Sequence, residues 1–275
     1  MIVVSLFSIA KFGFNKGVDF VGGTSIEYKV ENGLSTEDIS NELSDKGYDV
    51  SSIQKTSDNN YIFKFRNVDS SQRSEIESII EARSNQAVIE TKFELVGPSI
   101  GGELIKKTIY ALVISAVLIL FWVAVQFKNI FYGASAILAM LHDAFILVGS
   151  FSLLGYLFGA EIDFLFVTAL LTTLSFSVHD TIVVYDRIRE SQRKYGGNLY
   201  DLANKAVTET MVRSLNNSFT IIFMLVALIL LGGTSIKWFA VALLIGTVSG
   251  TYSSPFVAVP ILVTWDELQR KIKKS

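Results

Sequence analysis

The sequence predicts an α-helical polytopic membrane protein, in which a bundle of six transmembrane helices carries a small α+β domain outside the cytoplasm. Of the 275 residues, 50% are hydrophobic and only 18% are charged, a more apolar composition than soluble domains of this size have. The charges are clustered, so long windows carry none. Residues 13–104 are the one long stretch whose residue pattern is typical of a water-soluble domain.

Five segments within residues 105–265 are long enough to cross a hydrocarbon core of ~30 Å as helices. They contain either no charge or only one adjacent His-Asp pair: Thr108–Phe127, Ile130–Ala160, Phe164–Tyr185, Ser214–Ile236 and Trp238–Trp265. Residues 1–12 begin apolar but are too short to cross alone. They lack the basic start and small-residue cleavage pattern of a secretory signal. We interpret them as part of a first span, which brings the crossings to six.

The distribution of Lys and Arg predicts the orientation of the chain. Basic residues concentrate between residues 184 and 213 and in the tail 266–275, and six spans place both on one side. Because basic loops stay in the cytoplasm, we expect both termini there and residues 13–104 on the extracytoplasmic side. Lys106 and Lys107 depart from this trend. The chain has no cysteine for disulfides or thiol chemistry, and its net charge of -2 gives no indication of nucleic-acid binding.

The outer stretch predicts a β-α-β-β-α-β order. Strands are indicated by alternating apolar residues, and helices by a capping Ser35 with a glycine stop and by a buried isoleucine stripe. The expected elements are strand Ser25–Val30, a helix from Ser35 to about Lys46, strands Val50–Lys55 and Tyr61–Arg66, a helix from about Ser70 to Arg83, and strand Val88–Leu95. This order is that of a ferredoxin-like split βαβ unit.

Glycines are expected to shape two places in the chain. Gly97, Pro98, Gly101 and Gly102 link the outer domain to the second span and should end any strand there. They form either a hinge or an ordinary linker, and the sequence favours neither. In the sixth span, Gly246 and Gly250 belong to a small-residue face that lets helix backbones approach closely.

Asp180 is the main candidate functional residue. It lies ~10 Å inside the water boundary marked by Arg187 if the segment is helical, and a carboxyl at that depth is costly unless it has a partner. Burial and a nearby cation have opposing effects on proton affinity, so Asp180 could take up and release a proton. The alternative is a structural aspartate held by threonines. Its neighbour His179 is a second titratable group.

Arg213 is the candidate cation for Asp180. It begins the predicted fifth span, and Asn216, Asn217 and Thr220 continue its face into the membrane. The alternative is that Arg213 lies at the cytoplasmic end of the span only because basic residues are retained there.

His142 and Asp143 could join a proton relay or bridge helices through hydrogen bonds, with equal weight. Adjacent helical residues point about 100° apart and the chain has no other His or Cys, so we expect no metal and no cofactor. An intramembrane aspartyl protease is disfavoured. Tyr185-Asp186 matches half of its signature, but the companion Gly-x-Gly-Asp is absent from the predicted spans. With neither a metal site nor a protease signature in the sequence, we expect no enzyme activity.

Four motifs carry a resemblance to a known family. They are GVDFVGG at residues 17–23, GPSIG at 97–101, DTIVVYDRIRE at 180–190 and GTYSS at 250–254. In this order and spacing they closely resemble the SecF family, accessory subunits of the bacterial Sec protein-export machinery in the inner membrane. The similarity covers nearly the whole chain, and the last two motifs are the specific ones.

The resemblance implies half of a fold of the resistance-nodulation-division superfamily, with SecD as the other half and an outer domain of the P1 type. It also implies association with membrane lipid, the SecYEG channel, YajC and, indirectly, SecA, and use of the proton gradient to help exported unfolded polypeptides through late export. Asp180 and Arg213 match the residues that the family links to proton passage. The sequence departs from the family at three positions: His179 replaces Asn, Ser214 replaces Thr and Asn217 replaces Thr.

We therefore hypothesise a proton-coupled export subunit. The first alternative is a scaffold that stabilises the export channel without conducting protons. The second is a small-molecule efflux subunit of the same superfamily, which the small size of the outer domain disfavours.

Overall fold

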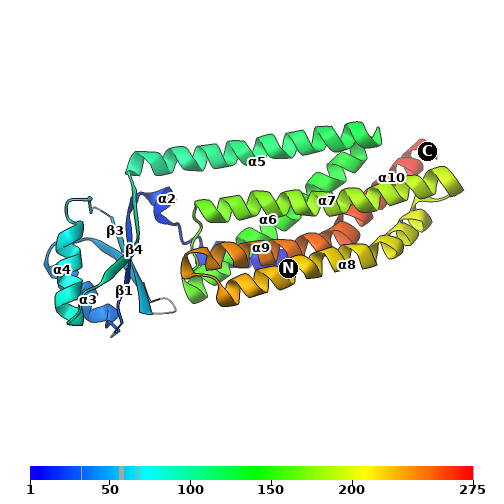
Figure 1. The fold of residues 1–275 in the computed structure, drawn as a ribbon. Helices are drawn as coiled ribbons and strands as arrows, with labels where there is room; N and C mark the ends of the chain where they lie inside the picture. Colours follow the sequence, from blue (N-terminus) through cyan, green and yellow to red (C-terminus); the bar gives the residue numbers. More distant parts are fainter. Residues whose placement is uncertain (32, 56–58, 67, 275) are drawn as a thin grey trace. The chain divides into compact units, whose positions relative to one another are not determined.

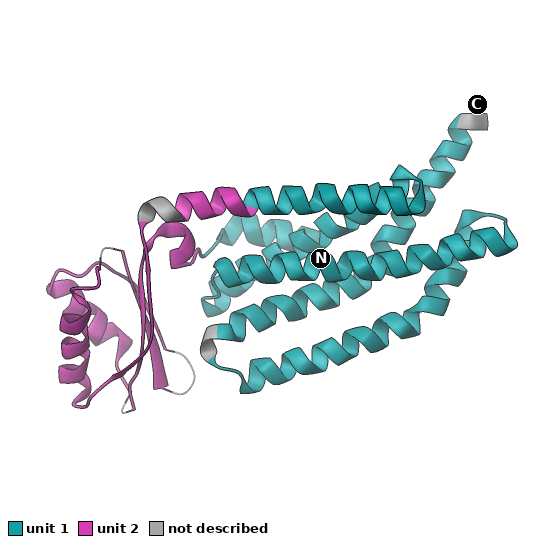
Figure 2. Ribbon diagram, turned by 45° about the horizontal axis from the view of Figure 1, so that its top comes forward, with its two compact units in different colours: residues 1–15, 109–275 teal, residues 16–108 magenta. Residues whose placement is uncertain are grey.

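The computed structural model describes residues 1–31, 33–55, 59–66 and 68–274, with the backbone alone described at 98–100, 234–235 and 273–274. The chain divides into two compact units (Figure 2). One comprises Met1–Asn15 and Ile109–Ser275, and the other comprises Lys16–Thr108. Each unit is described by itself below.

The unit formed by residues 16–108 is a four-stranded antiparallel sheet with two helices on one face (Figure 1). Its strand order is β2-β3-β1-β4. The elements are the short helix α2 (Val18–Val21), β1 (Gly23–Lys29), α3 (Thr36–Asp45), β2 (Val50–Lys55), β3 (Asn60–Phe65), α4 (Arg73–Ser84) and β4 (Ile89–Val96). The six elements expected from the sequence are present in the expected order, while α2 was not expected.

The core of this unit lies between the sheet and its two helices. Alternate residues of the strands, among them Ile26 and Phe63, are fully buried against Ile39 of α3 and Ile80 of α4. The N-terminus of α3 is capped as expected, because the Asp38 N–H donates to the Ser35 hydroxyl at 3.4 Å. Local pattern and tertiary packing agree here, so the elements lie close to where the sequence places them.

The glycine-rich ends of this unit meet at one close backbone contact. A Cβ added at Gly101 would lie 2.5 Å from the carbonyl oxygen of Phe20 in α2, so only glycine fits there without a shift. Gly102 has nothing within 4 Å of such a Cβ. Strand β4 ends at Val96 and helix α5 begins at Pro98, as the Gly-Pro pair predicts. Whether these residues act as a hinge stays a prediction.

The other unit is a bundle of long helices (Figure 1). It contains α1 (Ile2–Phe12), most of α5 (Pro98–Phe127), α6 (Ile130–Phe158), α7 (Phe164–Tyr195), α8 (Leu199–Leu231) and the continuous run of α9 (Thr234–Ser253), the π-helical segment η2 (Ser254–Ala258) and α10 (Val259–Lys274). Five helices in the described part of the chain are long and apolar enough to cross a membrane, whereas α1 is shorter.

The basic connection between the fourth and fifth predicted spans, residues 184–213, is helical except at residues 196–198. Helix α7 continues to Tyr195 and α8 begins at Leu199, which places Arg213 near the middle of α8. Ion pairs hold the charged turns together: Arg187 contacts Glu209 at 2.5 Å and Glu190 at 2.6 Å. Such pairs allow helices to extend beyond their apolar parts.

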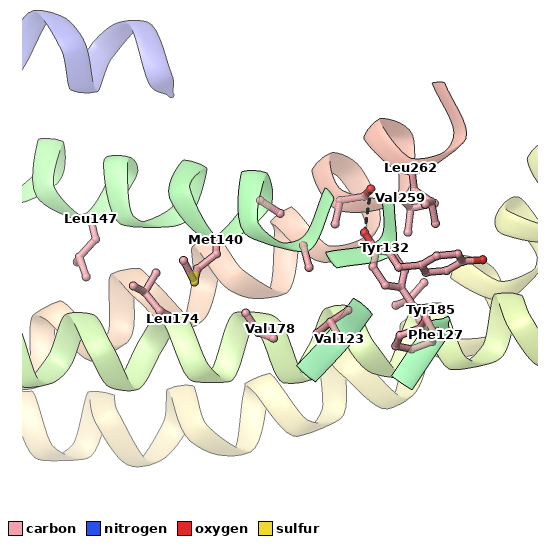
Figure 3. Packing of buried hydrophobic residues seen from close by; sticks show 14 of the residues in the cluster. Val123, Phe127, Tyr132, Met140, Leu147, Leu174, Val178, Tyr185, Val259 and Leu262 are labelled. Carbon is pink, nitrogen blue, oxygen red and sulfur yellow. Dashed lines mark hydrogen bonds between the residues drawn. The ribbon is translucent and has the colours of Figure 1, made fainter. Parts of the chain in front are cut away.

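Helix α7 lies at the centre of the bundle core. Figure 3 shows Leu147 and Met140 of α6 turned toward Leu174 and Val178 of α7. Tyr185 is fully buried. Its hydroxyl donates to the Ala258 carbonyl at 3.2 Å and lies 2.7 Å from the Ser135 hydroxyl. A buried tyrosine thus has partners for its polar end, as an apolar interior requires.

Helix α5 is the least buried of the five long helices, with 6% of its most apolar window buried in this chain. Its C-terminal end is fixed by Arg189 of α7, whose guanidinium donates to the Gln126 carbonyl at 2.8 Å and lies 4.9 Å from the centre of the Phe127 ring. A groove of about 350 Å³ separates part of α5 from α7 next to Val178 and Ile182.

Close packing of α9 on α7 yields a stability prediction. A Cβ added at Gly246 would collide with the side chain of Thr173, so Gly246→Ala should destabilise the bundle by about 1–3 kcal/mol. The measurement is thermal unfolding of the detergent-purified protein. Gly233→Ala is the control, because a Cβ there meets nothing within 4 Å. Equal unfolding temperatures for the two variants would contradict the close packing.

Candidate functional site

Asp180 is buried in the bundle, with 5% of its surface exposed. It lies on α7, whose N-terminus is capped by Asp163 through a 2.7 Å bond from the Phe166 N–H. The hydroxyl of Ser214 on α8 donates to Asp180 Oδ2. The Ser254 hydroxyl of the sixth span also lies within hydrogen-bonding reach of Asp180, so serines of two other helices are the partners of this carboxyl.

The structure does not bring Arg213 to Asp180 within this chain, and a role of Arg213 in proton passage stays a prediction. Arg213, Asn216, Asn217 and Thr220 are all exposed on the surface of the bundle. Adjacent residues of a helix point about 100° apart, so α8 can direct either Arg213 or Ser214 at Asp180, and it directs Ser214. No ion pair joins Arg213 to Asp180, both of which lie in the described part of the chain.

A second exposed polar stripe runs along α7. Thr172, Ser175 and His179 lie on the outer side of this helix, whereas Asp180 faces inward. The neighbours His179 and Asp180 therefore face different surroundings. Exposed polar side chains in the middle of apolar helices are unfavourable against lipid. The polar stripe on α7 and the stripe on α8 that contains Arg213 and Asn217 are therefore poor surfaces for contact with lipid alone.

Asp143 is held by four hydrogen bonds at the centre of the bundle, with 3% of its surface exposed. Its Oδ1 accepts from Ser249 at 2.7 Å and lies 3.1 Å from His142 Nδ1. Its Oδ2 accepts from Ser177 at 2.6 Å and from Ser253 at 2.5 Å. These bonds bridge α6, α7 and α9. Of the two alternatives left open by the sequence, helix bridging is thus present, and the proton relay stays a prediction.

Buried hydroxyls connect the surroundings of the two carboxyls. Thr181 Oγ1, next to Asp180, lies 3.0 Å from Ser254 Oγ, and Ser254 Oγ donates to the Ser177 carbonyl at 3.3 Å. On the other side, Ser218 lies one turn after Ser214 and its hydroxyl is 2.5 Å from Thr251 Oγ1 of α9. Helices α7, α8 and α9 therefore meet through hydroxyl groups around Asp180.

Sequence reasoning missed most of these serines as partners of the carboxyls. The spacing of the serines in the sequence could have indicated them. Ser214 and Ser218 are four residues apart, as are Ser249 and Ser253, so each pair shares one helix face. Gly246 and Gly250 lie on the same helix as the second pair and approach Thr173 and Ser177 of α7. The small residues let α9 come close enough for its serines to reach Asp143.

No metal centre is found in the part of the chain that the structure describes. No group of three or more His, Cys, Asp or Glu side chains is close enough there to hold a metal ion. The two His-Asp pairs each supply only adjacent residues of one helix. The side chains that surround the two buried carboxyls are hydroxyls and one imidazole, which form hydrogen bonds.

Comparison with known protein families gives two matches along the chain. Residues 76–268 match the family described as "Protein export membrane protein SecD/SecF, C-terminal". Residues 7–33 match the "SecD/SecF GG Motif".

Curated relatives and solved structures agree with these matches. The protein translocase subunit SecF of Thermobaculum terrenum is 42% identical over 93% of this chain and 86% of its own length. That of Sebaldella termitidis is 36% identical over 100% of this chain and 88% of its own.

The crystal structure of SecDF from Thermus thermophilus, a translocon-associated membrane protein, superposes with a TM-score of 0.85 at 31% identity. The match covers 97% of this chain and 36% of that one, so the chain spans about a third of the SecDF length. With a family match over most of its length and relatives of this identity, the chain belongs to the SecF family of protein translocase subunits, multi-pass proteins of the bacterial inner membrane with a role in protein export.

Proposed function

We propose that this chain, together with SecD, uses the proton gradient to assist late steps of protein export, and that Asp180 carries the proton. The observation that supports this most is a buried carboxyl in a membrane-spanning helix, with serine hydroxyls of two other helices, Ser214 and Ser254, as its hydrogen-bonding neighbours. Ionisable groups at such positions are costly and mark ion or proton pathways. The chain then acts as a transport subunit and not as an enzyme.

The proposed architecture has six spans. Helix α1 is part of the first span, and it packs on α6 so closely that a Cβ at Gly149 would collide with Ser5. Ser152 of α6 also donates to the Gly13 carbonyl at 2.7 Å. Residues 13–104 form a ferredoxin-like domain outside the cytoplasm, supported by the strand order β2-β3-β1-β4 and the two helices on one face. Both termini, including the basic residues 266–275, are then cytoplasmic.

The exposed polar stripes of α7 and α8 support SecD as the covering partner. SecDF relatives from Thermus thermophilus and Bacillus subtilis match this chain over 36% and 37% of their own length, so a second part of those proteins lies in the same polypeptide. We propose that SecD covers the stripes and that Arg213 acts on Asp180 when that surface is closed. Contacts with SecYEG, YajC, SecA and the exported polypeptide belong to the same proposal.

The proton gradient supplies enough energy for a switch at this site. One elementary charge that crosses 100 mV releases ~2.3 kcal/mol, which shifts a two-state equilibrium roughly fifty-fold. Protonation of Asp180 removes its charge and changes its bond to Ser214, so α7 and α8 can move against each other. Residues 97–102 would carry this movement to the outer domain.

The proposed topology is tested by labelling with an impermeant thiol reagent. Ser74→Cys, at an exposed position of α4, should react in intact cells. Gln192→Cys, exposed near the end of α7, should react only after lysis. The native chain has no cysteine, so it is the background control. The opposite pattern would overturn the orientation.

The proposed partner surface is tested by photo-crosslinking. A photoreactive amino acid at Asn217, on the exposed polar stripe of α8, should crosslink to SecD when the two are expressed together. The same group at Trp122, which is 65% exposed on α5 among apolar residues, is the control and should crosslink to lipid. A SecD crosslink at Trp122 with none at Asn217 would contradict the assigned surface.

The proton-coupled function is tested with Asp180→Asn in membrane vesicles that contain SecD and the channel. We expect the variant to fold and bind SecD, and its export rate with a proton gradient to fall to the rate without one. Asp186→Asn is the matched control, because Asp186 lies on the same helix but is exposed and pairs with Arg189. If Asp180→Asn keeps normal stimulation by the gradient, the chain is a scaffold and the proposal fails.

A further inference from the structure

The buried carboxyl on α6 has a different environment from the one on α7. We propose that Asp143, with Ser177, Ser249 and Ser253, is a positioning cluster that fixes the helices around Asp180, and that Asp143 is not a second proton carrier. This inference rests on the proposed function, because it assigns a role relative to the proton-carrying Asp180.

The hydrogen bonds of Asp143 favour a fixed acceptor. Each carboxyl oxygen has two neighbours that can donate, three of them serine hydroxyls at 2.5 to 2.7 Å. A carboxylate has no hydrogen to donate and suits such a site. A protonated Asp143 would need one hydroxyl to turn and accept instead, which would leave fewer donors for its other oxygen. Proton uptake therefore requires the cluster to reorganise.

The cluster reaches Asp180 through two helices. Ser177 precedes Asp180 by about one turn of α7, so the bond from Ser177 to Asp143 fixes this part of the helix. Ser253 and Ser254 of the sixth span are neighbours with different partners. Ser253 donates to Asp143, and Ser254 contacts Thr181 next to Asp180. Two adjacent residues of the sixth span therefore contact the surroundings of both buried carboxyls.

The backbone changes from α to π helix at this segment. Pro255, within η2, has no N–H and cannot continue a regular helix without loss. Single π turns in helices are frequent at functional sites. The change begins at Ser254, directly after the residue that contacts Asp143. The bond from Ser253 to Asp143 thus lies directly before the irregular turn. It fixes the helix at the point where the regular α-helical hydrogen bonding ends.

The charged and titratable groups near Asp180 come from three helices. On α7 they include the adjacent His179, which is exposed; on α6 they are His142 and Asp143; and on α8 the exposed Arg213 is nearest in sequence to Ser214. In residues 236–258 of the sixth span the titratable residues are Lys237, about 25 Å along the helix from Ser254, and the exposed Tyr252. The positioning effect on Asp180 is therefore carried by hydroxyl contacts of this span and not by a charge on it.

Carbodiimide labelling tests the inference, because carbodiimides react with protonated carboxyls. The full chain is labelled with SecD in membranes at a series of pH values, and adducts on each aspartate are measured by mass spectrometry. In the wild type we expect pH-dependent labelling of Asp180 and none of Asp143. Ser253→Ala should shift the midpoint for Asp180, because the loss of the bond to Asp143 frees the segment whose Ser254 hydroxyl contacts Asp180 and Thr181. The lost bond is one to Asp143, so the effect on Asp180 is transmitted by the altered positions of α7 and the sixth span, and Asp143 should also become reactive.

Two further variants separate positioning from general stability. Ser253→Thr keeps the hydroxyl and should restore the wild-type midpoint. Ser152→Ala removes a buried hydroxyl elsewhere on α6, where it bonds to the Gly13 carbonyl, and should leave the midpoint unchanged. Both are compared at equal amounts of folded protein.

Three other results of the labelling experiment would contradict the inference or the proposed function. An unchanged Asp180 midpoint in Ser253→Ala would show that the cluster only stabilises the fold. Labelling of Asp143 in the wild type over the same pH range as Asp180 would make Asp143 a second carrier. Either result overturns the inference and leaves the proposed function intact. Wild-type Asp180 that never labels would instead contradict the proposed function and, with it, this inference.

Discussion

The hydrogen bonds that satisfy two buried carboxyls are the constraint on which the membrane unit depends. An aspartate inside an apolar bundle costs several kcal/mol unless donors surround it. The chain meets this cost with serine hydroxyls from other helices, namely Ser177, Ser249 and Ser253 for Asp143 and Ser214 for Asp180. Serines have short side chains, so their helices must be close. The small residues of α9, among them Gly246 and Gly250, provide that closeness.

The roles proposed for the two carboxyls follow from the different number of hydrogen bonds around each. Asp143 has three hydroxyl donors and a histidine nitrogen, and its surroundings join three helices. Asp180 has two hydroxyl neighbours, Ser214 of α8 and Ser254 of the sixth span, and lies beside the exposed His179. A densely bonded group resists a change in protonation because several bonds must be rearranged together. A sparsely bonded group can change at lower cost, so the same residue type suits an anchor in one place and a carrier in the other.

The sequence predicts the fold better than it predicts the site, for physical reasons. The outer strands and helices follow from local alternation and caps such as Ser35, and five long helices follow from uncharged windows. The site depends on the rotation of each helix about its axis. Arg213 and Ser214 are adjacent, and only packing decides that Ser214 faces Asp180. The apolar window ends at Tyr185, but α7 continues to Tyr195, where ion pairs such as that between Arg187 and Glu209 support its charged turns.

Helix α5 connects two fixed contacts along one continuous helix. Arg189 holds its C-terminal end through the Gln126 carbonyl and the Phe127 ring, and Gly101 near its other end lies against the Phe20 carbonyl. Between these contacts Leu112, Ala116 and Ile119 pack against the bundle, although only 6% of the most apolar window is buried. A continuous helix of this length resists compression and bending, so a push or pull at one end reaches the other, about 40 Å away at the helical rise. Arg189 belongs to α7, so the helix that carries Asp180 is mechanically linked to the whole length of α5.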